Sequence, residues 1–297
     1  MAISLSKAST FADGLDHPEC LAAHPDGSWY AGGELGQIYH ISPDGKRVTE
    51  IGNTGGFVLG IAVSPDGAWL AICDLKHKAV FKFEIGSRTL SEFTRGGDEP
   101  FGIPNHLAFT RDGHLYVTDS GAFRKVTGKI HRFNLEGRGG VWHRGPFNFA
   151  NGIAIGPDGQ SVYVCCTWLP GVEKIEIKLD GTPGKRSVYA KFPKALPDGL
   201  AFDARGNLYA SCYAPARIYK VSRDRKVSIF IDDWEAHMLS NPTNIAFGGK
   251  NFDELYAANL GRWHLTKIAV KTKGCPLACH PAVEANRGGR GSRRAVR

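Results

Sequence analysis

One short sequence pattern occurs six times in this chain of 297 residues. Each copy has an opening residue, an apolar run, a turn containing Gly and a second run rich in Tyr, Val and Ala, as in NGIAIGPDGQSVYVCC. Spaced 40, 46, 46, 47 and 46 residues apart, the copies open at Glu19, Leu59, Asn105, Asn151, Asp198 and Asn244. A period in this range, with several short strands in each unit, is typical of a β-propeller. We therefore predict an all-β fold, a six-bladed β-propeller.

Each unit contains two further runs, except the last. A third run with polar and apolar residues in alternation, such as KIEIKL, is followed by a fourth, such as RSVYAKF. The last unit ends near TKIAVKT and lacks a fourth run, whereas residues 6–13 hold one ahead of the first unit. We therefore predict that the ring is closed by the N-terminal strand, which would remove an exposed sheet edge from the last blade.

The repeats continue without a linker, so we expect a single propeller domain over residues 1–280. The formal net charge is +8, and residues 281–297 contribute half of it with five arginines and one glutamate. This Gly/Arg-rich segment has little to bury and is expected to be a disordered basic tail. It has no interleaved aromatic residues, so no nucleic-acid partner is expected. We expect a monomer or a dimer.

The cysteines and the N-terminus bear on the cellular compartment. Seven cysteines are an odd number, and the first residues, MAISLSKASTFADG, contain no continuous apolar run of the kind that directs secretion. No apolar run approaches membrane-spanning length. We therefore expect reduced thiols in a cytoplasmic protein, with no membrane partner.

Five of the six opening residues are carboxylates or carboxamides. Equivalent positions of a propeller lie around one axis, so these side chains should converge in the central channel. They offer only oxygen ligands, a set that suits a divalent cation, with Ca²⁺ ahead of Mg²⁺ or Mn²⁺, and Zn²⁺ or Fe²⁺ less natural. The alternative is that the openers are polar only because they face channel water. The five are Glu19, Asn105, Asn151, Asp198 and Asn244.

Three runs, PDGLAFDARGNLYASCY (197–213), ANGIAIGPDG (150–159) and FGGKNFDELYAAN (247–259), resemble the senescence-marker-protein/gluconolactonase (regucalcin-like) family. The resemblance implies a six-bladed propeller that holds a divalent cation in its channel and hydrolyses lactones. It implies Glu19, Asn151 and Asp198 as metal ligands and Asn105 as a contact for bound water or substrate. Paraoxonases and bacterial phosphotriesterase propellers are similar to this family in using a calcium layer of Glu, Asn and Asp, which would give Asn244 a place.

Other residues are candidates for substrate contact. Members of the family that act on sugar lactones carry an Arg two residues before the Asn105 position, where this chain has Ile103, so we expect a more apolar pocket wall. Asp119 ends the second run of its unit, and His17 stands two residues before Glu19; both are further candidates. His106 should point away from the axis, by strand alternation.

The ligand set indicates the chemistry. A divalent ion polarises a lactone carbonyl and lowers the pKa of a bound water, and Asp198 is then the best general base. No GxSxG motif is present, so we expect direct attack by water on a lactone or ester. Two alternatives remain open: a non-catalytic calcium-binding regulatory or interaction propeller, and a strictosidine-synthase-like condensation enzyme. The acidic and amide layer argues against the last.

Overall fold

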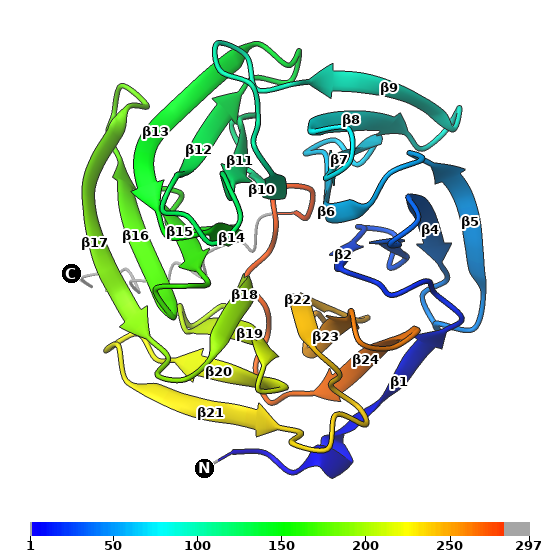
Figure 1. The fold of residues 1–297 in the computed structure, drawn as a ribbon. Coiled ribbons are helices and arrows are strands. Elements are labelled where there is room, and N and C mark those ends of the chain that lie inside the picture. Colours follow the sequence, from blue (N-terminus) through cyan, green and yellow to red (C-terminus); the bar gives the residue numbers. More distant parts are fainter. Residues whose placement is uncertain (1, 282–297) are drawn as a thin grey trace, which may run out of the picture.

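The innermost strands of six sheets stand around a central channel (Figure 1). The structure is a computed structural model that describes residues 2–281, and in these residues each sheet has four antiparallel strands. This confirms the six-bladed β-propeller. The innermost strands are β2 (Cys20–Ala23), β6 (Val58–Val63), β10 (Pro104–Phe109), β14 (Ala150–Ile155), β18 (Leu196–Phe202) and β22 (Pro242–Gly248).

Three more strands complete each blade, running outward from the channel. The second strands are β3 (Trp29–Gly32), β7 (Trp69–Asp74), β11 (Leu115–Asp119), β15 (Ser161–Cys166), β19 (Leu208–Ala214) and β23 (Glu254–Asn259). The third strands are β4 (Gln37–Ile41), β8 (Ala79–Glu84), β12 (Gly128–Phe133), β16 (Gly171–Ile177), β20 (Arg217–Val221) and β24 (His264–Ala269). The outer strands are β5 (Val48–Asn53), β9 (Thr89–Thr94), β13 (Gly139–Phe147), β17 (Pro183–Lys191), β21 (Val227–Asp232) and β1 (Ala8–Asp13), the last preceded by a 3₁₀ turn at Leu5–Lys7.

The N-terminal strand closes the ring, as predicted. Strand β1 pairs antiparallel with β24, and Ala8 lies opposite Ile268 in this pair. Phe11 of β1 packs edge-on against Tyr256 of the last blade and Trp29 of the first, with ring centroids 4.7 and 6.1 Å apart. The closing strand therefore joins the two ends of the repeat array by hydrogen bonds and by aromatic packing.

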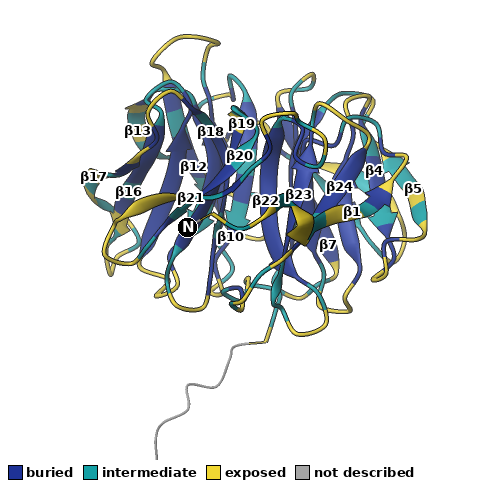
Figure 2. Ribbon diagram, turned by 90° about the horizontal axis from the view of Figure 1, so that it is seen from below, coloured by how far each residue is buried: buried dark blue, intermediate teal, exposed yellow. Residues whose placement is uncertain are grey.

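Burial falls from the inner strands to the outer ones (Figure 2). Every residue of β7 and β15 is buried, whereas the outer strands β9 and β21 consist mostly of exposed and partly buried residues. Second strands packed on both faces are therefore continuously apolar in sequence. The cores lie between neighbouring blades, where buried side chains of adjacent sheets meet.

Strand pairing gives the units a common register. Ala108 lies opposite Tyr116, and Ala246 opposite Tyr256. Every unit has an alanine at this place on its innermost strand: Ala22, Ala62, Ala108, Ala154, Ala201 and Ala246.

Counting back three residues from these alanines gives the opening residues predicted for five blades. In the sixth it gives Thr243, so the assignment of Asn244 to the opening position is one residue out of register. The Thr243 hydroxyl donates to the backbone carbonyl of Glu19 in the first blade, 2.8 Å away. Asn244 therefore lies one residue deeper in the channel than the other openers.

Three other expectations concern the membrane, the cysteines and the basic tail. No helix among residues 2–281 is long and apolar enough to span a bilayer. All seven cysteines are free thiols. The predicted disordered tail, apart from Pro281, lies outside the described residues.

Candidate functional site

The openers lie at one end of the channel, where the innermost strands begin. Each is directly attached to a buried apolar strand that packs against the next blade, and each is at least nine-tenths buried itself. Together these residues form a ring that we call the opener layer. Its polar members are Glu19, Asn105, Asn151, Asp198 and Thr243, and its apolar member is Leu59.

Asn151 has its amide orientation fixed by a neighbouring hydroxyl. Thr167, just after β15, donates its hydroxyl proton to the carbonyl of Pro197 in the next blade, 2.9 Å away. Its oxygen must then accept the hydrogen bond from Asn151 Nδ2, at 3.2 Å. The amide oxygen of Asn151 is thereby turned away from Thr167, and it is buried without a hydrogen-bond partner among the described residues.

Asn105 is held in the same way one blade earlier. Ser120 donates its hydroxyl proton to the carbonyl of Ala150, 2.6 Å away, and accepts from Asn105 Nδ2 at 3.0 Å. The Asn105 amide oxygen is therefore free as well. Ser and Thr residues after the second strand thus serve two purposes: they link neighbouring blades, and they orient two amide oxygens as acceptors.

Glu19 and Asp198 form a buried pair of carboxyl groups. Burial raises the pKa of Glu19 well above its ordinary value, and the nearby charge of Asp198 raises it further. Burial likewise raises the pKa of Asp198. Glu19 Oε2 has no hydrogen-bond partner in residues 2–281. Two buried acids with no cation beside them are unfavourable when ionised, because each lacks a compensating charge.

These features fit a divalent cation. Oriented amide oxygens, an unpartnered carboxylate oxygen and a second carboxylate are the ligands that hard cations take. A cation would also remove the conflict between the two acids, since an opposite charge favours their ionised form. No three His, Cys, Asp or Glu side chains gather at one point between residues 2 and 281, so the amides are needed to complete such a site.

One residue deeper, a side-chain contact crosses the channel. His106 Nε2 meets Asn244 Nδ2, and their blades, the third and the sixth, lie opposite each other in the ring (Figure 1). Burial lowers the pKa of His106 to about 4, so the imidazole is neutral near pH 7. The expectation that His106 points away from the axis is wrong. The register of β10 shifts between Pro104 and Leu107, and this bulge interrupts the strand alternation.

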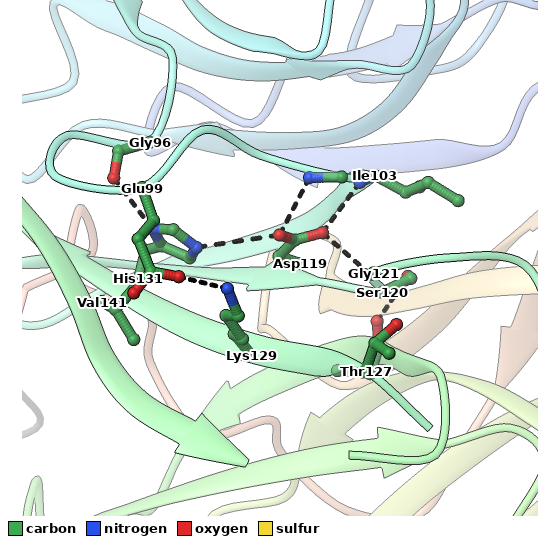
Figure 3. A network of polar contacts seen from close by, with 12 residues as sticks. Gly96, Glu99, Ile103, Asp119, Ser120, Gly121, Thr127, Lys129, His131 and Val141 are labelled. Carbon is green, nitrogen blue, oxygen red and sulfur yellow. Dashed lines mark hydrogen bonds and ion pairs between the residues drawn. The ribbon is translucent and has the colours of Figure 1, made fainter. Parts of the chain in front are cut away.

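Asp119 holds a loop rather than facing a substrate (Figure 3). Its carboxylate accepts from the backbone amides of Gly102, Ile103 and Gly121 at 2.8–3.0 Å, and His131 Nε2 lies 3.8 Å away. Burial alone would raise the pKa of Asp119, but His131 and the three amides outweigh it, and the pKa is lowered. Both carboxylate oxygens are occupied, which corrects the expectation that Asp119 contacts substrate.

Ile103 and His17 lie beside the layer. Ile103 is partly buried and packs against the apolar cluster that includes Leu59, so an apolar wall adjoins the openers. His17 Nδ1 lies 3.0 Å from Asp16 and 3.6 Å from Glu34, and its ring meets Trp263 edge-on. Its place before Glu19 puts it on the rim of the same channel end.

Three aromatic residues on this rim were not identified from the sequence. Phe149 precedes β14, Trp168 follows β15, and Phe123 lies in the loop between β11 and β12; their ring centroids are 5.8–6.0 Å apart. Phe123 is 61% exposed, and Trp168 Nε1 has no hydrogen-bond partner in the described chain. The sequence did contain a signal for these aromatic residues, because each stands within three positions of Asn151, Thr167 or Ser120 and so had to lie near the openers.

Comparisons with known proteins agree with this architecture. A family model described as "SMP-30/Gluconolactonase/LRE-like region" matches residues 76–259. The gluconolactonase of Zymomonas mobilis is 27% identical over 237 residues, which cover 72% of this chain and 64% of that protein. The chain thus spans less than two thirds of the length of this relative.

Solved structures show the same fold. A gluconolactonase from Xanthomonas campestris superposes with a TM-score of 0.75 at 20% identity, covering 88% of this chain and 89% of that one. A protein described as calcium-binding regucalcin, from Agrobacterium tumefaciens, superposes with a TM-score of 0.73 at 16% identity, covering 91% and 97%. At these identities the structures compare folds only.

Proposed function

Because this chain belongs to the SMP-30/gluconolactonase/LRE-like family, we propose that it is a metal-dependent lactone hydrolase whose reaction takes place at the opener layer. The observation that carries the proposal is the set of free oxygens around one channel end: the unpartnered atoms of Glu19 and Asn151 beside the buried carboxyl of Asp198. The similarity to a gluconolactonase supports lactones as the substrate class.

Glu19, Asn151 and Asp198 would hold the cation, with Asn105 directed at water or substrate. When bound, a divalent cation polarises a carbonyl oxygen and lowers the pKa of water. Asp198 takes the proton of the attacking water and returns it to the ring oxygen that leaves when the C–O bond breaks. The Asn105 amide oxygen can accept a hydrogen bond from that water, because Ser120 occupies its amide nitrogen.

The wall beside this layer favours lactones with few hydroxyl groups. Leu59 is the apolar opener, Ile103 packs against the cluster that contains it, and Phe149 and Phe123 add apolar surface on the rim. Hydroxyl groups buried against such a wall would lose hydrogen bonds to water without replacement. We therefore propose higher kcat/KM on alkyl-substituted lactones than on gluconolactone.

The test is a panel of alkyl lactones, gluconolactone, esters and phosphotriesters, assayed on chelated protein with Ca²⁺, Mg²⁺, Mn²⁺ and Zn²⁺ added back singly. We expect lactone turnover that depends on the added metal and that Asp198→Asn reduces to near background. Asp224→Asn, an exposed carboxylate on a turn far from the channel, is the matched control and should retain full turnover. Equal turnover in Asp198→Asn and wild type would exclude this mechanism.

The same free oxygens also favour a second candidate, a calcium-binding propeller without catalysis. Calcium binding that raises the melting temperature, with no turnover of any member of the panel, would identify this function. In that case Asp198→Asn should weaken calcium binding while every tested substrate remains intact.

A further inference from the structure

A cavity of about 440 Å³ lies in the channel on the far side of His106 and Asn244 from the carboxylates. Its wall is built by the third residue after each opener, which is alanine in all six blades. Four of these alanines are only partly buried although they sit on innermost strands, because their methyl groups face this space. The wall alanines are Ala22, Ala62, Ala108, Ala154, Ala201 and Ala246.

The segment that follows the last blade lies along this chamber. Residues 275–279 line the cavity, and in Figure 1 the orange-red segment crosses the centre of the ring. Cys275 N donates to the Phe202 carbonyl at 2.8 Å, and Arg111 donates to the carbonyls of Pro276 and His280 at 3.2 and 2.9 Å. The segment is thus fixed to blades on different sides of the channel.

The chamber is separated from the opener layer. The His106–Asn244 contact joins opposite blades at a level between the chamber and the opener layer. At this same level three blades have glycine, and none has room for a side chain: a Cβ on Gly152 would lie 2.0 Å from the Asp198 carbonyl, and one on Gly60 would lie 2.5 Å from the Asn105 carbonyl. The innermost strands of neighbouring blades therefore approach one another closely here, and the His106–Asn244 contact spans the channel at the same level.

We propose that this chamber is a second ligand site, distinct from the reaction site, that takes a small uncharged apolar molecule such as a medium-length alkyl chain or an aromatic ring. Its volume lies within the range of roughly 300–1,000 Å³ that is usual for small-molecule pockets. The polar residues of the lining stand at its ends: His106 and Asn244 meet at the inner end, and the charged residues Arg111, Asp112 and Asp158 are exposed turn residues beyond the strands. Between them the ring of six methyl groups offers dispersion contacts but no charge and no hydrogen-bond donor, so an ionised group held among the alanines would lose its hydration without compensation.

Alanine suits this purpose because it is the smallest residue with a side chain. Larger residues at the six positions would fill the channel, as side chains fill the interior of other small rings of strands. The same small residue type in all six blades leaves space in the channel between the His106–Asn244 contact and residues 275–279.

The test uses the full chain and the neutral fluorescent probe N-phenyl-1-naphthylamine. We expect saturable fluorescence enhancement that 1-octanol displaces, and at least a tenfold loss of affinity in Ala154→Leu, which fills the chamber. Ala122→Leu, the same change at an exposed position on the opposite face, is the matched control and should bind as wild type does. If Ala154→Leu does not fold, Ala154→Val and Ala201→Val make the same measurement with smaller changes.

Asp198→Asn should leave probe affinity unchanged, which separates this proposal from the proposed function. Three results would each overturn it. One is wild-type probe affinity in folded Ala154→Leu. Another is displacement of the probe by δ-valerolactone, since the chamber would then be part of the reaction site. The third is loss of probe binding in Phe123→Ala instead, which would place the probe on the aromatic rim.

Discussion

At the scale of single residues, hydroxyl groups decide which atoms of the channel are free to bind. Thr167 and Ser120 donate to carbonyls of the following blade, so each accepts from an asparagine Nδ2. The amide oxygens of Asn151 and Asn105 are then left as acceptors. The arrangement resembles the outer hydrogen bonds that orient metal ligands in many proteins.

Replacing Thr167 with Val should therefore weaken cation binding, although Thr167 is not a proposed ligand. The variant leaves Asn151 Nδ2 without its acceptor and the amide free to rotate. We expect a loss of calcium affinity of roughly 10–100-fold by calorimetry on chelated protein. Thr167→Ser should restore most of it, and Thr182→Val, on an exposed turn, should have no effect. Unchanged affinity in Thr167→Val would show that Asn151 is positioned by other contacts.

The buried acids predict a pH dependence of stability for the metal-free protein. The pKa values of Glu19 and Asp198 are raised by folding, from ordinary values of 4.5 and 3.8. A raised pKa contributes stability that is fully present below the unfolded pKa and is lost as pH rises towards the folded one. Chelated protein should thus melt at a lower temperature at about pH 8 than at about pH 5.

Calcium should reverse this loss at the higher pH, and Asp198→Asn should remove part of the pH dependence. Thermal melts of both proteins, with chelator and with Ca²⁺, provide the measurement. Chelated wild type that gains stability as pH rises through this window would contradict the raised pKa values.

Single residues also show which parts of the candidate site could be predicted from the sequence. The five openers from Glu19 to Asp198 follow from the repeat alone, because spacing fixes register. Asn244 was misplaced because its unit was aligned by its carboxamide, whereas alignment by the alanine common to all units gives Thr243. His106 could not be placed, since a bulge reverses the direction that alternation predicts.

At the scale of elements, one carboxylate organises the connection between the second and third blades. Asp119, the last residue of β11, accepts from the amides of Gly102 and Ile103 in this connection and from that of Gly121 in the loop after β11 (Figure 3). In the sequence it looked like a substrate contact because it ends a strand on the correct rim. Backbone amides leave no sequence signal, so its true partners were not predictable.

Asp119→Asn should loosen this loop. Asparagine has one acceptor oxygen in place of two, so at least one of the amides of Gly102, Ile103 and Gly121 loses its partner. We expect a loss of roughly 1–3 kcal/mol in the free energy of unfolding by urea denaturation. Hydrogen exchange should quicken at these three amides but not at Cys275, whose amide bonds elsewhere. Unaltered exchange at all three would show that the loop is held without Asp119.

At the scale of the whole molecule, the ring depends on its first strand. Deleting residues 2–13 removes β1, exposes the edge of β24 and removes Phe11 from its contacts with Trp29 and Tyr256. We expect aggregation or a clear fall in melting temperature, because an unpaired edge is a template for association. Deleting residues 282–297 is the control and should change the melting curve far less. Equal melting curves for the two truncations would contradict this role of β1.

Ring closure also sets an order for biosynthesis. Strand β1 leaves the ribosome before the other strands, but its partner β24 is made about 250 residues later. At roughly 5–20 residues per second, the first strand waits about 10–50 seconds for the last blade. During this interval the five earlier blades can stack on one another as they emerge, while the nascent chain carries a β-strand without a partner. The protein is therefore most exposed to chaperones, and to pairing with other chains, until its final blade has been translated.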